Sequence, residues 1–311
     1  MNRMGIESPV LLCALVFGLT GLSAPSRADL FVSTHTSVEE LTDSGTFVKT
    51  FVPSSGGGLS GAAALHFGPD GNLYVATANA IKVYNGHTGS YIKDFTAASA
   101  LDFVFDASGN MYAVDGVSVQ KYDASGTLLK TYTDGVSTPE GIIFAPNGRL
   151  LVSNTYSGAY ANTITSLDPS NGSFSTFATG LGEPVGMTIG PDGRYYVANY
   201  TFALSYGGTN PDTIQVVGAG GGSSTTWNQG GNLHGAEYLV FVGNRLFVTS
   251  YYNGTVQIFD TSSGASVGES APFPNVLGIA YAAATAVPEP SELVLLATGL
   301  LGVVLGLGKR R

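Results

Sequence analysis

The stretch LHFGPDGNLYV at residues 65–75 decides the fold of this 311-residue chain. It places two apolar runs on either side of a Pro-Asp-Gly turn, and Asp-Gly between β-prone segments is a strong hairpin signal. The same pattern returns at residues 103–113, 142–152 and 187–197, and in a weaker copy at 238–248. Equivalent positions lie 38 to 51 residues apart, at Leu73, Met111, Leu150, Tyr195 and Leu246. The chain is therefore expected to repeat one structural unit.

A second hairpin follows the first in most copies, for example residues 81–84 with 91–95 and 119–122 with 127–132. Four short strands in about 40 residues are typical of a β-propeller blade. Residues 29–33 match the second strand of a unit that lacks a first strand, and residues 277–281 supply that strand. The sequence thus predicts an all-β, six-bladed β-propeller over residues 29–284, closed by pairing its N- and C-terminal strands.

The two ends read as targeting segments. Residues 1–28 contain Arg3, an apolar run at 10–22 and small residues before Asp29, the pattern of a signal peptide; an uncleaved anchor is the alternative. The single cysteine, Cys13, lies inside this segment, so the exported chain is expected to hold no disulfide and no cysteine nucleophile.

Near the C-terminus, Pro288-Glu289-Pro290 precedes an uncharged apolar run at residues 293–308 and the basic end Lys309-Arg310-Arg311. This arrangement over residues 285–311 resembles the PEP-CTERM sorting signal of Gram-negative bacteria. The resemblance implies recognition by an exosortase, a transmembrane helix at 293–308, and export linked to extracellular polysaccharide, with the protein membrane-anchored or released to the cell surface. A plain tail anchor would explain the apolar run and the charges of Arg310 and Arg311, but not the Pro-Glu-Pro motif.

Composition narrows the classes of partner. The 43 glycines, 11% aromatic residues and 11% charged residues argue against a helical bundle and against a disordered chain. The net charge is −9, and residues 29–287 hold eight basic and nineteen acidic side chains. Such a surface argues against nucleic acid as a ligand, because phosphates require a basic face.

Each second strand ends on a short polar residue, which the repeats place on one face of the ring: Thr34, Thr77, Asp115, Asn154, Asn199 and Ser250. They either satisfy local hydrogen bonds or form a ligand site at the channel mouth. The loops after Asn154 and Asn199 are expanded, and this face gathers Tyr156, Tyr160, Tyr200, Tyr206, Tyr251 and Tyr252. The predicted ligand-binding residues are Asp115, Glu140, Asn154, Asn199, Tyr156, Tyr200 and Tyr251, a set suited to stacking on sugars of a polysaccharide.

The turn pattern also resembles NHL and SMP-30-like propellers, which implies an alternative function as a divalent-metal-dependent hydrolase, such as a lactonase, or a lyase. Lactonases of that kind take ligands partly from the residue before a glycine at the start of each inner strand. Here only Glu140 fits clearly, with Glu183 and Glu237 as weaker candidates. Glu140, Asp115 and Asn154 together offer oxygens to Ca²⁺. Because no complete ligand set is visible, the sequence assigns no cofactor and no catalytic residue.

Overall fold

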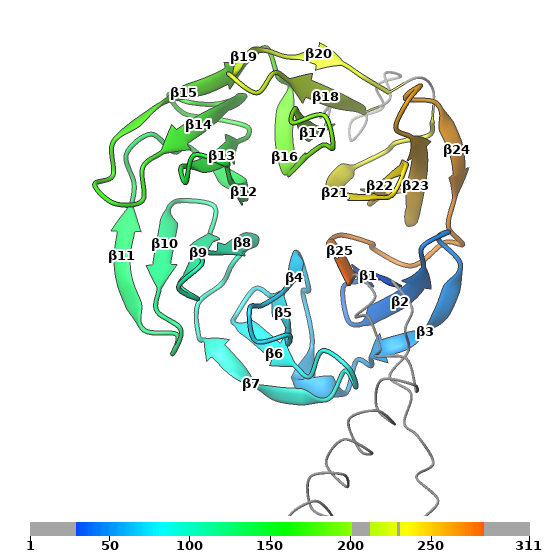
Figure 1. Ribbon diagram of the computed structural model, residues 1–311. Coiled ribbons are helices and arrows are strands. Elements are labelled where there is room, and N and C mark those ends of the chain that lie inside the picture. The colour runs from blue at the N-terminus through cyan, green and yellow to red at the C-terminus, as the bar shows by residue number, and fades with distance from the viewer. Residues whose placement is uncertain (1–28, 201–211, 229–230, 283–311) are drawn as a thin grey trace, which may run out of the picture. The chain divides into compact units, whose positions relative to one another are not determined.

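The computed structural model describes residues 29–200, 212–228 and 231–282, and arranges them as six sheets around a central axis (Figure 1). Each sheet is one blade, and its strands are given from the innermost outward. Blade 1 consists of β25 (Ile279–Ala282), β1 (Asp29–Ser33), β2 (Val38–Thr42) and β3 (Phe47–Val52). Blade 2 consists of β4 (Leu65–Phe67), β5 (Leu73–Ala76), β6 (Ile81–Tyr84) and β7 (Tyr91–Thr96), and blade 3 of β8 (Asp102–Phe105), β9 (Met111–Val114), β10 (Val119–Tyr122) and β11 (Leu128–Tyr132).

Blade 4 has five strands, β12 (Pro139–Phe144), β13 (Leu150–Asn154), β14 (Thr163–Leu167), β15 (Phe174–Thr179) and β19 (Gly222–Ser223). Blade 5 consists of β16 (Glu183–Ile189), β17 (Tyr195–Tyr200), β18 (Thr213–Val217) and β20 (Thr225–Thr226). Blade 6 consists of β21 (Ala236–Val242), β22 (Arg245–Ser250), β23 (Thr255–Asp260) and β24 (Ser266–Glu269). A short 3₁₀ helix, η1 (Gly56–Gly58), lies between blades 1 and 2. The predicted six-bladed propeller is confirmed.

Ring closure follows the predicted route. β25 pairs antiparallel with β1, in a register that places Asp29 opposite Ala282 and Val32 opposite Ile279. The closing strand begins two residues later than the sequence pattern suggested. The innermost strand of blade 1 therefore comes from the opposite end of the chain to its other three strands.

The apolar runs of the second strands are explained by packing on both faces of each sheet. Successive side chains of a strand point to opposite faces. In β1, Leu30 and Val32 pack against blade 6, whereas Phe31 packs against blade 2. The same alternation in the other blades produces six apolar clusters, one between each pair of neighbouring blades. Each blade is thus held by its two neighbours and not by a core of its own.

Two features cross between blades. In the first, the chain leaves β18 through a turn at residues 218–221 and adds β19 in parallel to β15 of blade 4, before it returns to blade 5 as β20. In the second, the Tyr238 hydroxyl of blade 6 donates a 3.0 Å hydrogen bond to the Leu101 carbonyl of blade 3, which lies across the ring (Figure 1). Tyr238 is buried and ties opposite sides of the ring together.

The predicted signal peptide (1–28), the predicted sorting segment (285–311) with its helix at 293–308, and most of the expanded loop after Asn199 lie outside the described residues. Within the part of the chain that the structure describes, no helix has the length and apolar character needed to cross a membrane.

Candidate functional site

The upper face of the ring is defined here as the face where each innermost strand begins and each second strand ends. Its predicted ring of six polar residues serves mainly to hold the local backbone. Thr34 and Thr77 bond the backbone of the next hairpin turn, at Ser37 and Ala80. The Asp115 carboxylate accepts hydrogen bonds from the Val117 and Ser118 backbone and from the Gln120 amide. These three residues stabilise the hairpin of their own blade.

The other three members of the ring fasten the loop that enters their blade. Asn154 Oδ1 accepts the Ser137 N–H at 2.8 Å, and Asn199 Oδ1 accepts the Gly182 N–H at 2.7 Å. Ser250 Oγ bonds both the N–H and the carbonyl of His234. Asn154, Asn199 and Ser250 are buried. The predicted ligand atoms of Asp115, Asn154 and Asn199 are therefore engaged by the protein's own backbone and side chains, and their binding role stays a prediction.

The innermost strands of blades 4, 5 and 6 differ from those of blades 1, 2 and 3. β12, β16 and β21 have six or seven residues and each contains a break in register, at 139–142, 184–187 and 236–239. β4, β8 and β25 are three or four residues long and pair without such a break. Bulges re-aim side chains and recur near functional sites. Glu140 and Glu237 lie in two of these irregular segments, and Glu183 begins β16.

These three glutamates form a cluster, called here the acidic mouth. Burial raises the pKa of Glu140 to about 7; Thr155 partly opposes this rise through hydrogen bonding, and the charge of Glu183 adds to it. Burial also raises the pKa of Glu183, helped by Asp212. The pKa of Glu237 is raised well above its ordinary value by burial, with further contributions from Glu140 and Asp212. The carboxyl groups thus lie within electrostatic reach of one another in a desolvated setting.

Tyrosines accompany the acidic mouth. Burial and the charges of Glu140, Glu237 and Glu183 all raise the pKa of Tyr156, so its hydroxyl lies within electrostatic reach of the three glutamates. Tyr156 has a left-handed backbone (φ 49°) and is 49% exposed. A non-glycine residue in that region is uncommon and is a reason to look for function.

A second aromatic group extends from the same face. The Tyr200 hydroxyl bonds the Tyr252 hydroxyl at 3.0 Å, and their rings stack with centroids 6.2 Å apart. Tyr251 packs edge-on against Tyr252, and the His234 ring lies 4.7 Å from the same tyrosine. The predicted residues Tyr200 and Tyr251 therefore come together through Tyr252, and Tyr156 is coupled electrostatically to Tyr200.

Several polar groups at this site have no partner within the described residues. Glu183 Oε2 and His234 Nε2 are buried atoms without a hydrogen bond. Hydrogen bonding makes no contribution to the raised pKa of Glu237. Buried polar groups are nearly always satisfied in folded proteins, so unsatisfied ones call for an explanation such as a bound ligand.

Calcium binding by Glu140, Asp115 and Asn154 stays a prediction. Among residues 29–200, 212–228 and 231–282, no three His, Cys, Asp or Glu side chains are placed to hold a metal ion. Asp115 faces the hairpin of its own blade and Asn154 faces Ser137, whereas Glu140 belongs with Glu183 and Glu237.

The sequence pattern predicted Glu140, Tyr156, Tyr200 and Tyr251 as site residues, which stays a prediction, and it did not point to His234. The position of His234 beside Tyr252 comes from its backbone bond to Ser250, which no local pattern announces. Glu140 and Glu237 do not align clearly when the repeats are compared, because a bulge shifts the register of each strand.

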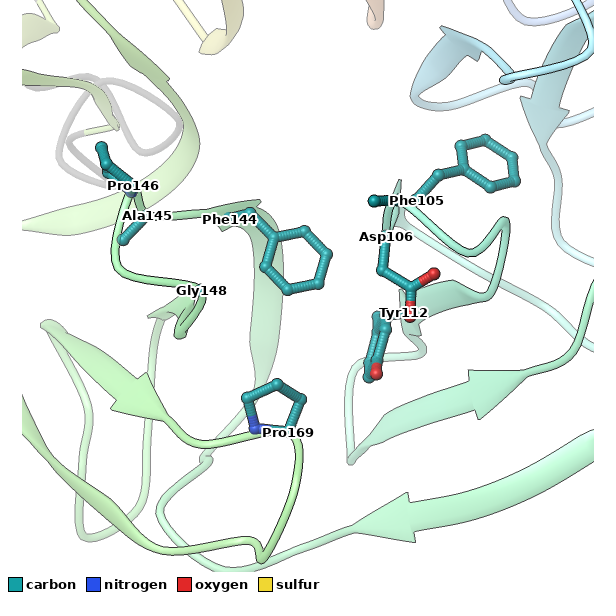
Figure 2. A pocket seen from close by; sticks show the side chains of 9 residues that line it. Phe105, Asp106, Tyr112, Phe144, Ala145, Pro146, Gly148 and Pro169 are labelled. Atoms are coloured by element: carbon teal, nitrogen blue, oxygen red, sulfur yellow. The ribbon is translucent and has the colours of Figure 1, made fainter.

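The lower face carries a separate hollow between blades 3 and 4, with a volume of about 420 Å³ (Figure 2). Its walls are Phe105, Asp106, Ala107, Tyr112, Phe144, Ala145, Pro146, Gly148 and Pro169. In blades 2 and 5 a tyrosine ring packs closely over a glycine of the turn, Tyr74 over Gly68 and Tyr196 over Gly190. Blade 3 has Asp106 at the equivalent position, so Tyr112 lies instead against Phe144. The sequence did not predict this hollow.

Comparison with known proteins establishes the fold and nothing narrower. No family model and no curated protein matches the sequence. A chain of a nidogen/laminin complex matches with a TM-score of 0.67 and 15% identity, over 82% of this chain and 98% of that one. A Bacteroides caccae protein of unknown function gives 0.61 and 13%, with the same coverage of 82% and 98%. Streptogramin B lyase gives 0.52 and 14%, over 79% of this chain and 75% of its own.

Proposed function

We propose that this propeller is a binding module whose site is the acidic mouth together with Tyr156, Tyr200 and Tyr252, and whose ligand is an extracellular glycan. The observation that carries the proposal is that three partly buried glutamates lie at or near the starts of the innermost strands of three adjacent blades and influence one another's pKa. Tyr156 and the Tyr200–Tyr252 pair lie on the same face of the ring. Carboxylate oxygens accept hydrogen bonds from sugar hydroxyls, and aromatic rings offer flat apolar surface with a polar tip. Ligand sites combine such surfaces with a few convergent polar groups.

The proposal includes export. Residues 1–28 support secretion across the cytoplasmic membrane, and Pro288, Glu289 and Pro290 with the basic end at Arg310 and Arg311 support sorting by an exosortase. Replacement of the three motif residues by alanine should leave the chain unprocessed or mislocalised in the host, as judged by fractionation and the mass of the mature protein. Unchanged processing and location would overturn the sorting proposal.

Binding is tested by titrating the protein with the host's own extracellular polysaccharide and with defined oligosaccharides. Tyr156→Ala should weaken binding at least about tenfold, because it removes the half-exposed ring beside the glutamates. Tyr91→Ala is the matched control, since Tyr91 is 41% exposed on the outer strand β7 of blade 2. Equal affinity of the Tyr156 variant, the Tyr91 variant and the parent would overturn the site.

A second function, acid–base catalysis by a hydrolase or lyase, is favoured by one observation. A carboxylic acid with a pKa of about 7, as at Glu140, is matched to proton transfer near neutral pH. Catalysis should release new reducing ends or new double bonds from a bound polysaccharide, and Glu140→Gln should abolish that release without abolishing binding. A polysaccharide that binds and stays intact over long incubation would eliminate this function.

A further inference from the structure

The lysines and arginines of the described residues lie on outer strands and on the lower face, away from the acidic mouth. Residues 29–282 contain five lysines and three arginines. The lysines all lie on third and fourth strands of blades 1 to 3, at Lys49, Lys82, Lys93, Lys121 and Lys130. Arg149, Arg194 and Arg245 lie at the turns between first and second strands, on the lower face. No described lysine or arginine accompanies the three glutamates.

Ionisation of these carboxylates is unfavourable when no positive charge lies beside them. Like charges in a desolvated site oppose one another's ionisation, and Glu140, Glu183, Glu237 and Asp212 contribute to this opposition in pairs. The carboxylate of Asp212 is stabilised by the N–H groups of Gly235 and Ala236. For Glu237, hydrogen bonding makes no contribution that would offset the raised pKa. A cation that enters the site would remove the repulsion.

Observations other than the acidic residues indicate what kind of cation fits. Among the described residues, Glu183 Oε2 and His234 Nε2 are buried atoms with no hydrogen-bond partner. A carboxylate oxygen accepts an N–H, and so does a histidine ring nitrogen that carries no proton. Tyrosine rings lie on the same face: the His234 ring is 4.7 Å from the Tyr252 ring, and Tyr252 stacks on Tyr200. Tyr156 lies within electrostatic reach of the glutamates. Tyrosine faces attract ammonium groups, and cages of such rings recognise organic cations.

We propose that the acidic mouth binds an organic ammonium group, with Glu237 as its main charge partner and tyrosine rings beside its carbon substituents. This inference rests on the proposed function and narrows its ligand from glycans in general to amine-bearing ones. The ammonium group has two sources, a free amine or a glucosamine-type sugar within a polysaccharide, and both present the same chemistry to the site.

The test uses isosteric pairs and the full-length chain in detergent, with calorimetry as the readout. Choline and its neutral isostere 3,3-dimethylbutan-1-ol probe the free amine, and glucosamine oligomers against N-acetylglucosamine oligomers probe the polymer. The charged member of at least one pair should bind at least tenfold more tightly. The pair that shows the difference identifies the source.

Variants separate the charge from the fold. Glu237→Gln should remove most of the preference for the charged member while leaving binding of the neutral member unchanged, and Glu183→Gln should reduce it in the same direction. Asp43→Asn, an exposed acid in the β2–β3 turn, should have no effect. Circular dichroism and thermal unfolding establish that each variant folds; if Glu237→Gln does not, Glu183→Gln carries the test.

Three outcomes are decisive. Preference for the charged members that depends on Glu237 or Glu183 supports the inference. N-acetylated oligomers that bind as tightly as glucosamine oligomers, with no preference for choline, overturn the inference and leave the proposed glycan site intact. Absence of binding by every probe and by the host polysaccharide overturns both.

Discussion

Single residues on the inner strands determine how closely neighbouring blades approach. A Cβ atom added to Gly141 would overlap the carbonyl oxygen of Val185 in blade 5, and Ser153 Oγ also donates to that oxygen at 2.7 Å. Glycine is required here by the close approach of two backbones and not by backbone conformation. Blades 1 and 2 approach one another in the same way, since a Cβ atom added to Gly278 would overlap the Ala63 carbonyl oxygen.

The first prediction concerns this packing. Gly141→Ala should lower the free energy of unfolding by about 2 kcal/mol or more, because backbone must shift to relieve the overlap. Gly268→Ala on the outer strand β24 is the control, since nothing lies within 4 Å of its Cβ position. Urea unfolding monitored by fluorescence compares the two variants. A Gly141 variant as stable as the Gly268 variant would show that the blades separate freely.

The second prediction concerns the pH dependence of stability. The pKa of Glu140 rises from 4.5 to about 7 on folding, so between these values the folded state holds a proton that the unfolded state has lost. Stability should therefore fall as pH rises from about 4.5 to 7, by on the order of 2 kcal/mol from this residue. Glu140→Gln should flatten that part of the profile. A variant that loses stability with pH as steeply as the parent would contradict the assignment of the proton to Glu140.

At the scale of elements, the polar residues of the upper face join the ends of second strands to the loops that enter each blade. The third prediction tests whether such a residue holds a loop in place or binds a ligand. Asn154→Ala leaves the half-buried Ser137 N–H without its buried acceptor and should destabilise the protein by about 1–3 kcal/mol. Ligand affinity of the folded variant should stay unchanged if the role is structural. Asn79→Ala, at an exposed turn position, serves as the control. Loss of affinity with full stability would make Asn154 a ligand residue instead.

Most elements could be predicted because their signals are local. The Pro-Asp-Gly turns and the alternation of apolar residues define both hairpins of a blade without reference to distant sequence. The strand β19 could not be predicted, since it consists of Gly222 and Ser223 and exists only through pairing with β15 of another blade. The same limit applies to the site. Glu140 stood out at its repeat position, whereas the grouping of Glu183, Glu237 and His234 depends on bulges and on contacts between blades.

On the scale of the whole molecule, the ring depends on one seam between strands from the two ends of the described domain. Asp29 and Ala282 lie opposite one another in the β1–β25 register. In the double variant Asp29→Cys/Ala282→Cys, a disulfide between the two new cysteines would close a loop of about 250 residues. Loop-closure entropy gives about 5 kcal/mol for such a loop as an upper value. In a Cys13→Ser background, the oxidised form should unfold at markedly higher denaturant concentration than the reduced form. Equal midpoints would mean that the seam opens without unfolding the ring.

The seam also sets the order in which the protein matures. The innermost strand of blade 1 is made last, so β1 waits with an unpaired edge until residue 282 has been synthesised. Contacts so distant in sequence form slowly. Until then blade 1 has only three of its four strands, so the ring cannot close. The ring can therefore close only after β25 has been synthesised, near the end of residues 29–282.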